Sequence, residues 1–237
     1  MTRFPTTRWS LVLEAAADSA RSRQALEGLC QTYRSPVLAY VRGRGYKADE
    51  ADDLAQTFFT RFIERAQHAH ADPARGRFRA FLLTALKHFL NDAADHAHAL
   101  KRGGHVPLRS LDSLVEGADS YDRIQESETP ERVFERAWAQ AVLQSALSRL
   151  RDEANAAGKS ELFNHLREFL IERPNDSDYA RVAETLNLRR NTLAVAVHRL
   201  RNRLRELVCA ELAETAADDA NLDQELEELR HCLATVL

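Results

Sequence analysis

The sequence predicts an all-α protein of two small helical domains joined by a linker, the C-terminal domain being a helix-turn-helix. Three observations predict this class. Alanine, leucine, arginine and glutamate dominate the chain, and all four favour helix. Glycine is scarce, with 8 residues among 237. Apolar residues recur at helical spacing, and alternating runs rich in valine, isoleucine and threonine are almost missing.

The N-terminal half shows the patterns of four helices. Pro36 should kink or restart the second helix, because proline lacks a backbone N–H and clashes with the preceding turn. Asp49 opens the third helix, and a loop around Pro73 and Gly76 precedes the fourth. The predicted helices cover residues 11–17, 22–43, 50–66 and 77–100.

The composition changes after Arg102, where a stretch with glycine, proline, serine and six acids has no sustained periodicity. Pro130 then suits the first turn of a new helix. The later helices are predicted at 131–156, 159–172, 177–186 and 190–214, with one more around 221–234. The domain plan is an N-terminal extension (1–21), a first domain (22–102), a linker (103–130), a second domain (131–207) and an acidic C-terminal extension (208–237).

Composition narrows the function classes. The net charge is -3, so affinity for nucleic acid must come from a local excess of positive charge. No apolar run reaches membrane-spanning length, which favours a cytoplasmic protein without membrane contact. We expect no metal, cofactor or catalytic group, because the His pairs 68/70 and 96/98 have i,i+2 spacing and the cysteines have no metal-binding spacing. The cysteines, expected to be reduced, are Cys30, Cys209 and Cys232.

The segment from Tyr179 to Arg205 predicts two short crossed helices with a tight turn between them. Ala183 is small where the helices must cross, and Asn187 tolerates the left-handed backbone of the turn. Residues 181–205 hold seven arginines and one acid, Glu184, a net of +6 that suits DNA phosphates. Base edges would be contacted by Arg189, Arg190, Asn191 and Thr192, and phosphates by Arg199, Arg201 and Arg203.

Two motifs distinguish the N-terminal half. The first, EADDLAQTFF at residues 50–59, has an acidic first turn followed by an aromatic face, which can dock a basic partner or simply complement the helix dipole. The second, RFRAFLL at residues 77–83, interleaves arginines with aromatic residues. Such interleaving suits single-stranded nucleic acid, and it also occurs in core helices whose arginines extend to solvent.

Together with the C-terminal segment, these motifs resemble the sigma-70 family of bacterial initiation factors. The likeness is to the small extracytoplasmic-function (ECF) type, in a subgroup with N- and C-terminal extensions. It implies that domain 22–102 resembles sigma region 2, which binds core RNA polymerase and the minus-10 element. It also implies that domain 131–207 resembles region 4, which reads the minus-35 element.

The resemblance also assigns residues. Glu50, Asp52, Asp53 and Gln56 would meet the clamp helices of the largest polymerase subunit. The loop at 68–77 would hold a flipped base of the non-template strand. Promoter DNA on the minus-10 side would be contacted by Arg75, Arg77, Arg79, Lys87, Lys101 and Arg102.

Some positions depart from the family pattern. Thr57 stands where the family usually has glutamate, and Phe81 where it usually has tryptophan. Thr57 and Thr60 are candidate phosphorylation sites, because a phosphate at Thr57 would restore the negative charge. Arg189 and Arg190 stand where serine and glutamate are common, which exchanges a helix cap for positive charge. An anti-sigma factor or a Ser/Thr kinase is the expected type of regulator.

Two other functions fit parts of the pattern. One is a stand-alone helix-turn-helix regulator that binds a palindromic operator without polymerase, and the other is an all-α interaction protein that binds no DNA. The acidic segment 206–237, with a net charge of -8, offers two interpretations of its own. It could mask the basic helices, or it could form a solubilising helix that packs through Leu222, Leu226, Leu229 and Leu233.

Overall fold

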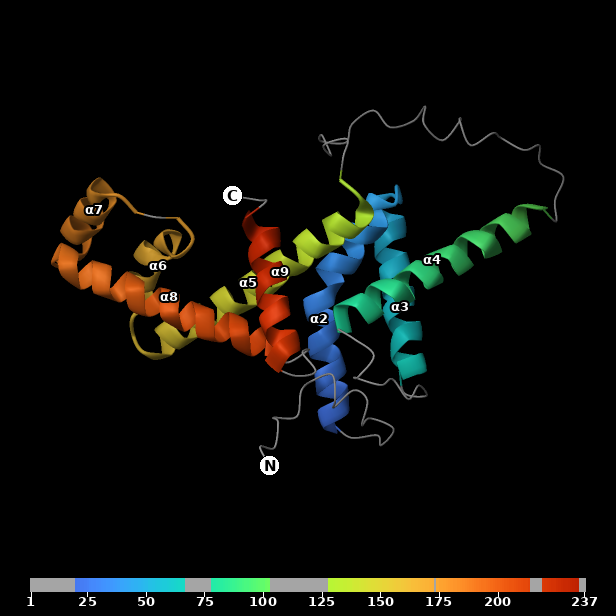
Figure 1. Cartoon of the computed structure of the whole chain (residues 1–237), viewed down its shortest axis with the longest axis horizontal. Helices are drawn as coiled ribbons and strands as arrows, with labels where there is room; N and C mark the ends of the chain where they lie inside the picture. Colours follow the sequence, from blue (N-terminus) through green and yellow to red (C-terminus); the bar gives the residue numbers. More distant parts are fainter. Residues whose placement is uncertain (1–19, 67–77, 103–127, 173, 214–218, 235–237) are drawn as a thin grey trace. The chain divides into compact units, whose positions relative to one another are not determined.

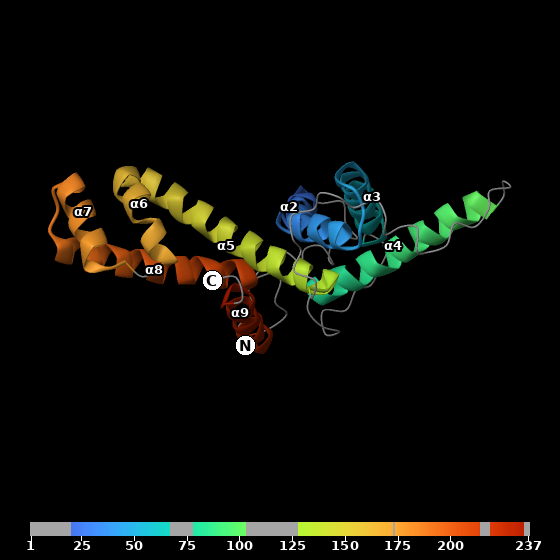
Figure 2. The ribbon, with the colours of Figure 1, turned by 90° about the horizontal axis from the view of Figure 1, so that it is seen from above.

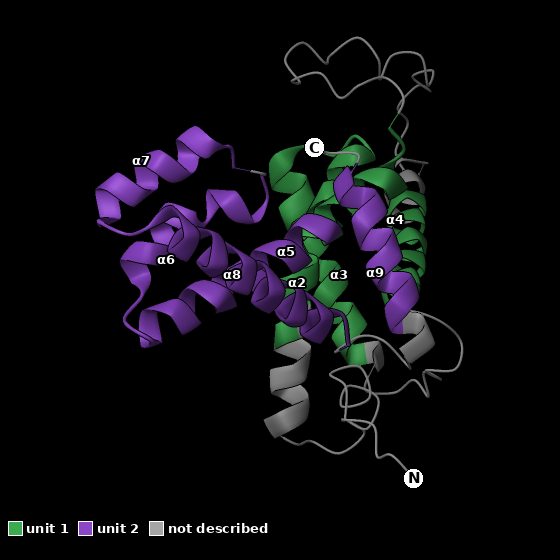
Figure 3. Ribbon diagram, turned by 60° about the vertical axis from the view of Figure 1, so that its left-hand side comes forward, with its two compact units in different colours: residues 1–138 green, residues 139–237 purple. Residues whose placement is uncertain are grey.

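The computed structural model describes residues 20–66, 78–102, 128–172, 174–213 and 219–234 (Figure 1). Within these ranges every regular element is helical, which confirms the all-helical prediction for the described part. The predicted helix at 11–17, the loop at 67–76 and most of the linker lie outside them. The chain divides into two compact units, residues 1–138 and 139–237, coloured separately in Figure 3.

Unit 1 contains α2 (Ala20–Gly43), α3 (Ala48–Ala66), α4 (Phe78–Arg102) and the first turns of α5 (Pro130–Ala156). Figures 1 and 2 show α2 and α3 side by side, with α4 crossing them. The turn after α2 requires Gly45, whose φ is 91°. The helix α2 runs through Pro36 without interruption, so of the two predicted outcomes, a kink or a restart, the restart is wrong.

An aromatic cluster forms the core of unit 1. Tyr33 meets Phe78 edge-on at a centroid distance of 5.0 Å, and the rings of Phe58 and Phe89 lie 5.6 Å apart. These residues sit on the apolar faces of α2, α3 and α4, so the helical spacing seen in the sequence becomes the packing surface. Other buried members are Val37, Tyr40, Val41, Leu82, Leu86, Leu90, Phe134 and Trp138.

Unit 2 contains the rest of α5, then α6 (Ser160–Leu166), the 3₁₀ turn η3 (Glu168–Leu170), α7 (Asp176–Leu186), α8 (Arg190–Ala213) and α9 (Asp219–Ala234). The predicted continuous helix at 159–172 is wrong, because α6 stops at Leu166. The tighter η3 turn follows, and it carries two buried residues, Phe169 and Leu170.

The connection between α7 and α8 confirms the predicted turn residue. Asn187 has φ 51° and ψ 43°, the left-handed conformation, and its N–H donates to carbonyls at the end of α7. At the other end of α7, Asn175 and Asp178 form a capping box. The two helices share a buried cluster with α6 and η3, made of Leu166, Phe169, Val182, Leu193 and Val197.

The acidic helix α9 packs on α8. Leu229 and Glu225 are each 4% exposed, and Leu222, Leu226 and Leu233 are half-buried on the same helix. Figure 1 shows α9 at the end of α8 opposite to α7. This arrangement favours the packing interpretation of the acidic segment over masking of the start of α8.

Candidate functional site

One face of α3 presents acidic and polar side chains to solvent. Asp49 and Glu50 lie in the first turn of the helix, where negative charge complements the helix dipole. Glu50, Asp53 and Gln56 are exposed. They are three of the four residues assigned to polymerase contact, and they occupy a surface on which a basic partner can dock.

Asp52, the fourth of these residues, has partners within unit 1. Its carboxylate oxygens lie 3.2 Å from Arg34 Nη2 and 3.7 Å from Arg42 Nη2, both on α2. The carboxylate therefore joins α3 to α2, and any polymerase contact it makes is shared with these arginines.

Thr57 and Thr60 lie on the exposed side of α3, next to the acidic residues. Their hydroxyls donate to backbone carbonyls one turn earlier, Thr57 to Asp53 O at 2.8 Å and Thr60 to Gln56 O at 3.0 Å. Both hydroxyls thus already have hydrogen-bond acceptors inside the helix.

The cations assigned to the minus-10 side are only partly described. Arg75, Arg77 and the side chains of Lys101 and Arg102 lie outside the described part of the chain. Arg79 is 4% exposed. Its guanidinium carbon lies 3.7 Å from the centroid of the Trp138 ring, and its Nε lies 3.1 Å from Glu135 Oε2. Arg79 is therefore covered by the start of α5.

Lys87, two turns further along α4, also meets α5. Its ammonium lies 2.8 Å from Glu131 Oε1, and both side chains are about two-fifths exposed. The hydrogen bond between them raises the pKa of Lys87 and lowers the pKa of Glu131, because each group stabilises the other's charged form.

Phe81 is the one aromatic residue of the RFRAFLL motif that stays exposed, with 43% of its surface accessible. Phe62 of α3 lies 5.9 Å from it between ring centroids, whereas Phe78 is buried. The motif therefore combines the two interpretations made from the sequence, because one ring belongs to the core and the other is presented for contact.

The start of α8 presents four polar side chains. Arg189, Arg190, Asn191 and Thr192 are all exposed, directly after the left-handed turn. Val195, one turn later, is 43% exposed and adds an apolar group to the same helix. The first turn of α8 thus offers donors, acceptors and positive charge to a partner.

The three arginines assigned to phosphates have different surroundings. Arg201 donates to Phe169 O from Nε at 2.9 Å and to Glu172 O from Nη2 at 2.9 Å, so it binds one carbonyl of η3 and one just after it. Arg203 pairs with Glu153 and Glu206, which lowers the pKa of Glu153 and raises that of Arg203. Arg199 is exposed.

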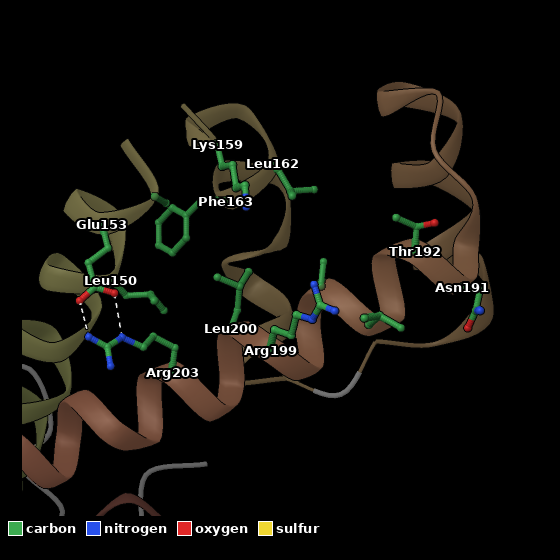
Figure 4. A pocket seen from close by; sticks show the side chains of 13 residues that line it. Leu150, Glu153, Lys159, Leu162, Phe163, Asn191, Thr192, Arg199, Leu200 and Arg203 are labelled. Carbon is green, nitrogen blue, oxygen red and sulfur yellow. Dashed lines mark hydrogen bonds and ion pairs between the residues drawn. The ribbon is translucent and has the colours of Figure 1, made fainter. Parts of the chain in front are cut away.

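Arg199 lies in an open groove of about 630 Å³ between α5, α6 and α8, shown in Figure 4. Lys159 and Phe163 line it from α6, and Asn191 and Thr192 from α8. Arg203 and Glu153, which pair with each other, also line the groove. The groove therefore adjoins the polar start of α8.

None of the described helices has an apolar stretch long enough to cross a membrane. No three His, Cys, Asp or Glu side chains of the described residues are arranged to bind a metal ion.

Comparison with known families identifies part of the chain. The family described as Sigma-70 region 2 matches residues 29–98. These residues form a sigma-70 region 2 domain. Region 2 of sigma-70 factors binds core RNA polymerase and the minus-10 element. Sigma factors are not enzymes, as the sequence predicted. No curated protein and no solved structure matched the chain.

The region 2 match covers α3 and most of α2 and α4, so it includes the acidic face of α3 and both described cations of α4. It ends before α5. The contacts that α5 makes with Arg79 and Lys87 were missed by the sequence analysis, because nothing in the local pattern connects α4 with residues beyond the linker. Asn175 and Asp178 were also missed, although their i,i+3 spacing is a recognisable capping signal.

Proposed function

We propose that the protein is a two-domain ECF-type initiation factor that directs polymerase to minus-35 and minus-10 elements. The exposed face of α3 docks on the clamp helices of the largest polymerase subunit, and α4 takes minus-10 DNA. The helices α7 and α8 act as a region 4-like helix-turn-helix, with the start of α8 in the major groove. The region 2 match at residues 29–98 is the observation that carries this proposal.

The geometry of unit 2 supports the minus-35 part of the proposal. A three-residue connection through left-handed Asn187 brings the exposed first turn of α8 directly after α7. Side chains at the start of a recognition helix are those that reach base edges. Arg189 and Arg190 add positive charge, which favours approach to the duplex.

Transcription by purified core polymerase tests the proposal. The protein and core polymerase are incubated with a randomised pool of promoter-length DNA, and initiated templates are recovered and sequenced. We expect two enriched elements separated by a fixed spacer. Recovery of one palindrome that binds without polymerase would instead support the stand-alone regulator.

The polymerase-docking face is tested by charge reversal. Asp53→Arg should weaken binding to core polymerase, because it places a cation in the centre of the acidic face of α3. Glu161→Arg, an exposed acid in the first turn of α6, is the matched control. Equal binding by the two variants would exclude this face as the docking surface.

The acidic C-terminal extension is tested by truncation. A cut after Leu207 would remove Val208 and Leu212, which are buried, so a cut after Ala213 is the cleaner deletion of α9. We expect unchanged promoter affinity and an unchanged salt slope, because α9 packs at the far end of α8. A gain in affinity would restore the masking hypothesis.

A further inference from the structure

The first turns of α5 make a continuous set of contacts with α2 and α4. Phe134 is fully buried, and its ring meets Tyr40 of α2 edge-on at a centroid distance of 6.4 Å. Glu131 and Glu135 bind Lys87 and Arg79 of α4. We call residues 130–138 the docking segment, and all of its contacts described here lie within unit 1.

The contacts of the docking segment lie on one helix face. Phe134 and Glu135 follow Glu131 by three and four residues and precede Trp138 by four and three, which aligns all of them along one side of α5. The apolar members do most of the anchoring, since Phe134 and Trp138 are 0% and 1% exposed. The carboxylates add charge complementarity, because each binds a cation of α4.

The cations covered by this segment are the two described residues that the proposed function assigns to minus-10 DNA. Arg79 is 4% exposed and lies against Trp138, so a phosphate cannot approach it while α5 is docked. Lys87 already binds a carboxylate, the same kind of anionic oxygen ligand that DNA offers. DNA and the docking segment therefore compete for one surface.

We propose that the docking segment is an intramolecular competitor that excludes minus-10 DNA from α4 until α5 is displaced. This inference rests on the proposed function, because it takes α4 as the DNA-contacting helix. It makes the factor a poor DNA binder on its own. The exposed face of α3 takes no part in the described contacts of the segment, so core polymerase can bind while the segment is docked.

A reversible disulfide tests the competition. A Cβ at Gly43 lies 3.5 Å from Pro130 Cβ, which is within the range of about 3.5–4.5 Å that disulfides span. The variant Gly43→Cys/Pro130→Cys, with serine replacing Cys30, Cys209 and Cys232, can lock α5 onto α2. Oxidised glutathione forms the bond and dithiothreitol breaks it, so one protein serves as its own control for folding.

The locked and unlocked forms are compared on the promoter recovered with the unmodified protein. We expect both forms to co-elute with core polymerase, and the oxidised form to initiate at least about tenfold less often, because a covalent lock removes the undocked state. Equal initiation by the two forms overturns the inference, and so does loss of polymerase binding on oxidation. Failure of the proposed function gives a different result, because no promoter is then recovered with any form.

A second measurement avoids the disulfide. Trp9 and Trp138 are the two tryptophans of the chain, so Trp9→Phe leaves Trp138 as the one indole reporter. Adding a saturating single-stranded 20-mer of random sequence to this isolated variant should displace the segment and shift the Trp138 emission to longer wavelength. An unchanged emission at saturating DNA contradicts displacement.

Charge variants distinguish the loss of the Glu131 and Glu135 contacts from the general effect of a less negative protein on DNA binding. Glu131→Gln/Glu135→Gln removes both carboxylates that meet α4 and should strengthen binding of the same 20-mer about three- to tenfold. The control Glu128→Gln/Glu161→Gln makes the same change in net charge. Glu128 lies in the same region but pairs with Arg136. Equal gains by the two pairs would assign the effect to net charge and overturn the inference.

Discussion

The cations of α4 and those at the start of α8 both follow basic sequence patterns, yet their surroundings differ. Arg79 and Lys87 are bound by carboxylates of α5, and Arg79 is buried. Arg189 and Arg190 are exposed and follow a tight turn. The difference teaches that a basic run predicts where positive charge is placed, whereas the availability of that charge depends on segments distant in sequence.

The same lesson applies within α8 itself. Arg190 and Arg201 belong to one basic helix, but Arg201 donates to backbone carbonyls in and just after η3. An arginine that holds a turn contributes to the fold, and an arginine that faces solvent is available to phosphates. The predictions below test this division from the largest expected effect to the smallest.

Phe134→Ala tests the region in which α5 covers the cations of α4. Removing a fully buried aromatic ring should destabilise unit 1 by ~3–5 kcal/mol, since it deletes buried contacts and leaves a cavity. Urea unfolding of the full chain, followed by circular dichroism, measures the change. Val195→Ala, at a 43% exposed position of unit 2, is the control and should change stability little. A loss below about 1 kcal/mol would show that the docking segment is not packed on unit 1.

Arg201→Ala tests whether some arginines of α8 stabilise the fold while others remain available to phosphates. Losing hydrogen bonds from a charged donor to two carbonyls should cost ~1–3 kcal/mol of stability. Arg205→Ala removes an exposed arginine of the same helix whose described hydrogen bond is to Asn202, and it should cost much less. Thermal unfolding of both variants at equal concentration decides between a structural and a purely DNA-binding Arg201.

Arg190→Ala tests the exposed cations at the start of α8. Its removal should lower affinity for duplex promoter DNA by about 1–3 kcal/mol with little effect on folding, and should relax the preference for one base pair of the site. Arg167→Ala, an exposed cation at the end of α6, is the matched control. Unchanged affinity and base preference in the Arg190 variant would remove this residue from the DNA contacts. Fluorescence anisotropy with promoter duplexes substituted at single base pairs gives both quantities.

Lowering the pH should slightly weaken the docking of residues 130–138 on α4. The pKa of Glu131 is lowered and that of Lys87 is raised, so their pair stabilises docking between those two values. The contribution is present above the ordinary glutamate pKa of about 4.3 and is lost as the pH falls through the lowered value. Because the pair is about two-fifths exposed, the effect should stay below ~1 kcal/mol. Trp138 emission in the Trp9→Phe background reports it, and the same titration of Glu131→Gln should lack this component.

Local features of the fold were well predicted from the sequence. Seven helices fall close to their expected ranges, because apolar spacing and proline or glycine at the ends depend on neighbouring residues. Asn187 adopts the left-handed turn for the same local reason. The break after Leu166 was missed, since it depends on how Phe169 packs with Val182 of α7 and with Leu193 and Val197 of α8.

Contacts between distant segments were the least predictable part of the candidate site. The partners of Arg79 lie more than fifty residues further along the chain, and no periodicity in either helix connects them. Arg201 looked like a phosphate ligand because the sequence shows its charge and not the carbonyls that it binds. Side-chain type could be read from the sequence, whereas partner choice required the packed structure.

The hydrogen bonds of the Thr57 and Thr60 hydroxyls determine what a phosphate on α3 would replace. Each is bonded to a carbonyl of its own helix, and a phosphate in its place would have no hydrogen to donate there. A modifying enzyme would first have to break this bond, which rotation of the exposed side chain about χ1 does without opening the helix. Such a modification would therefore replace a hydrogen bond within α3 by negative charge on its exposed face.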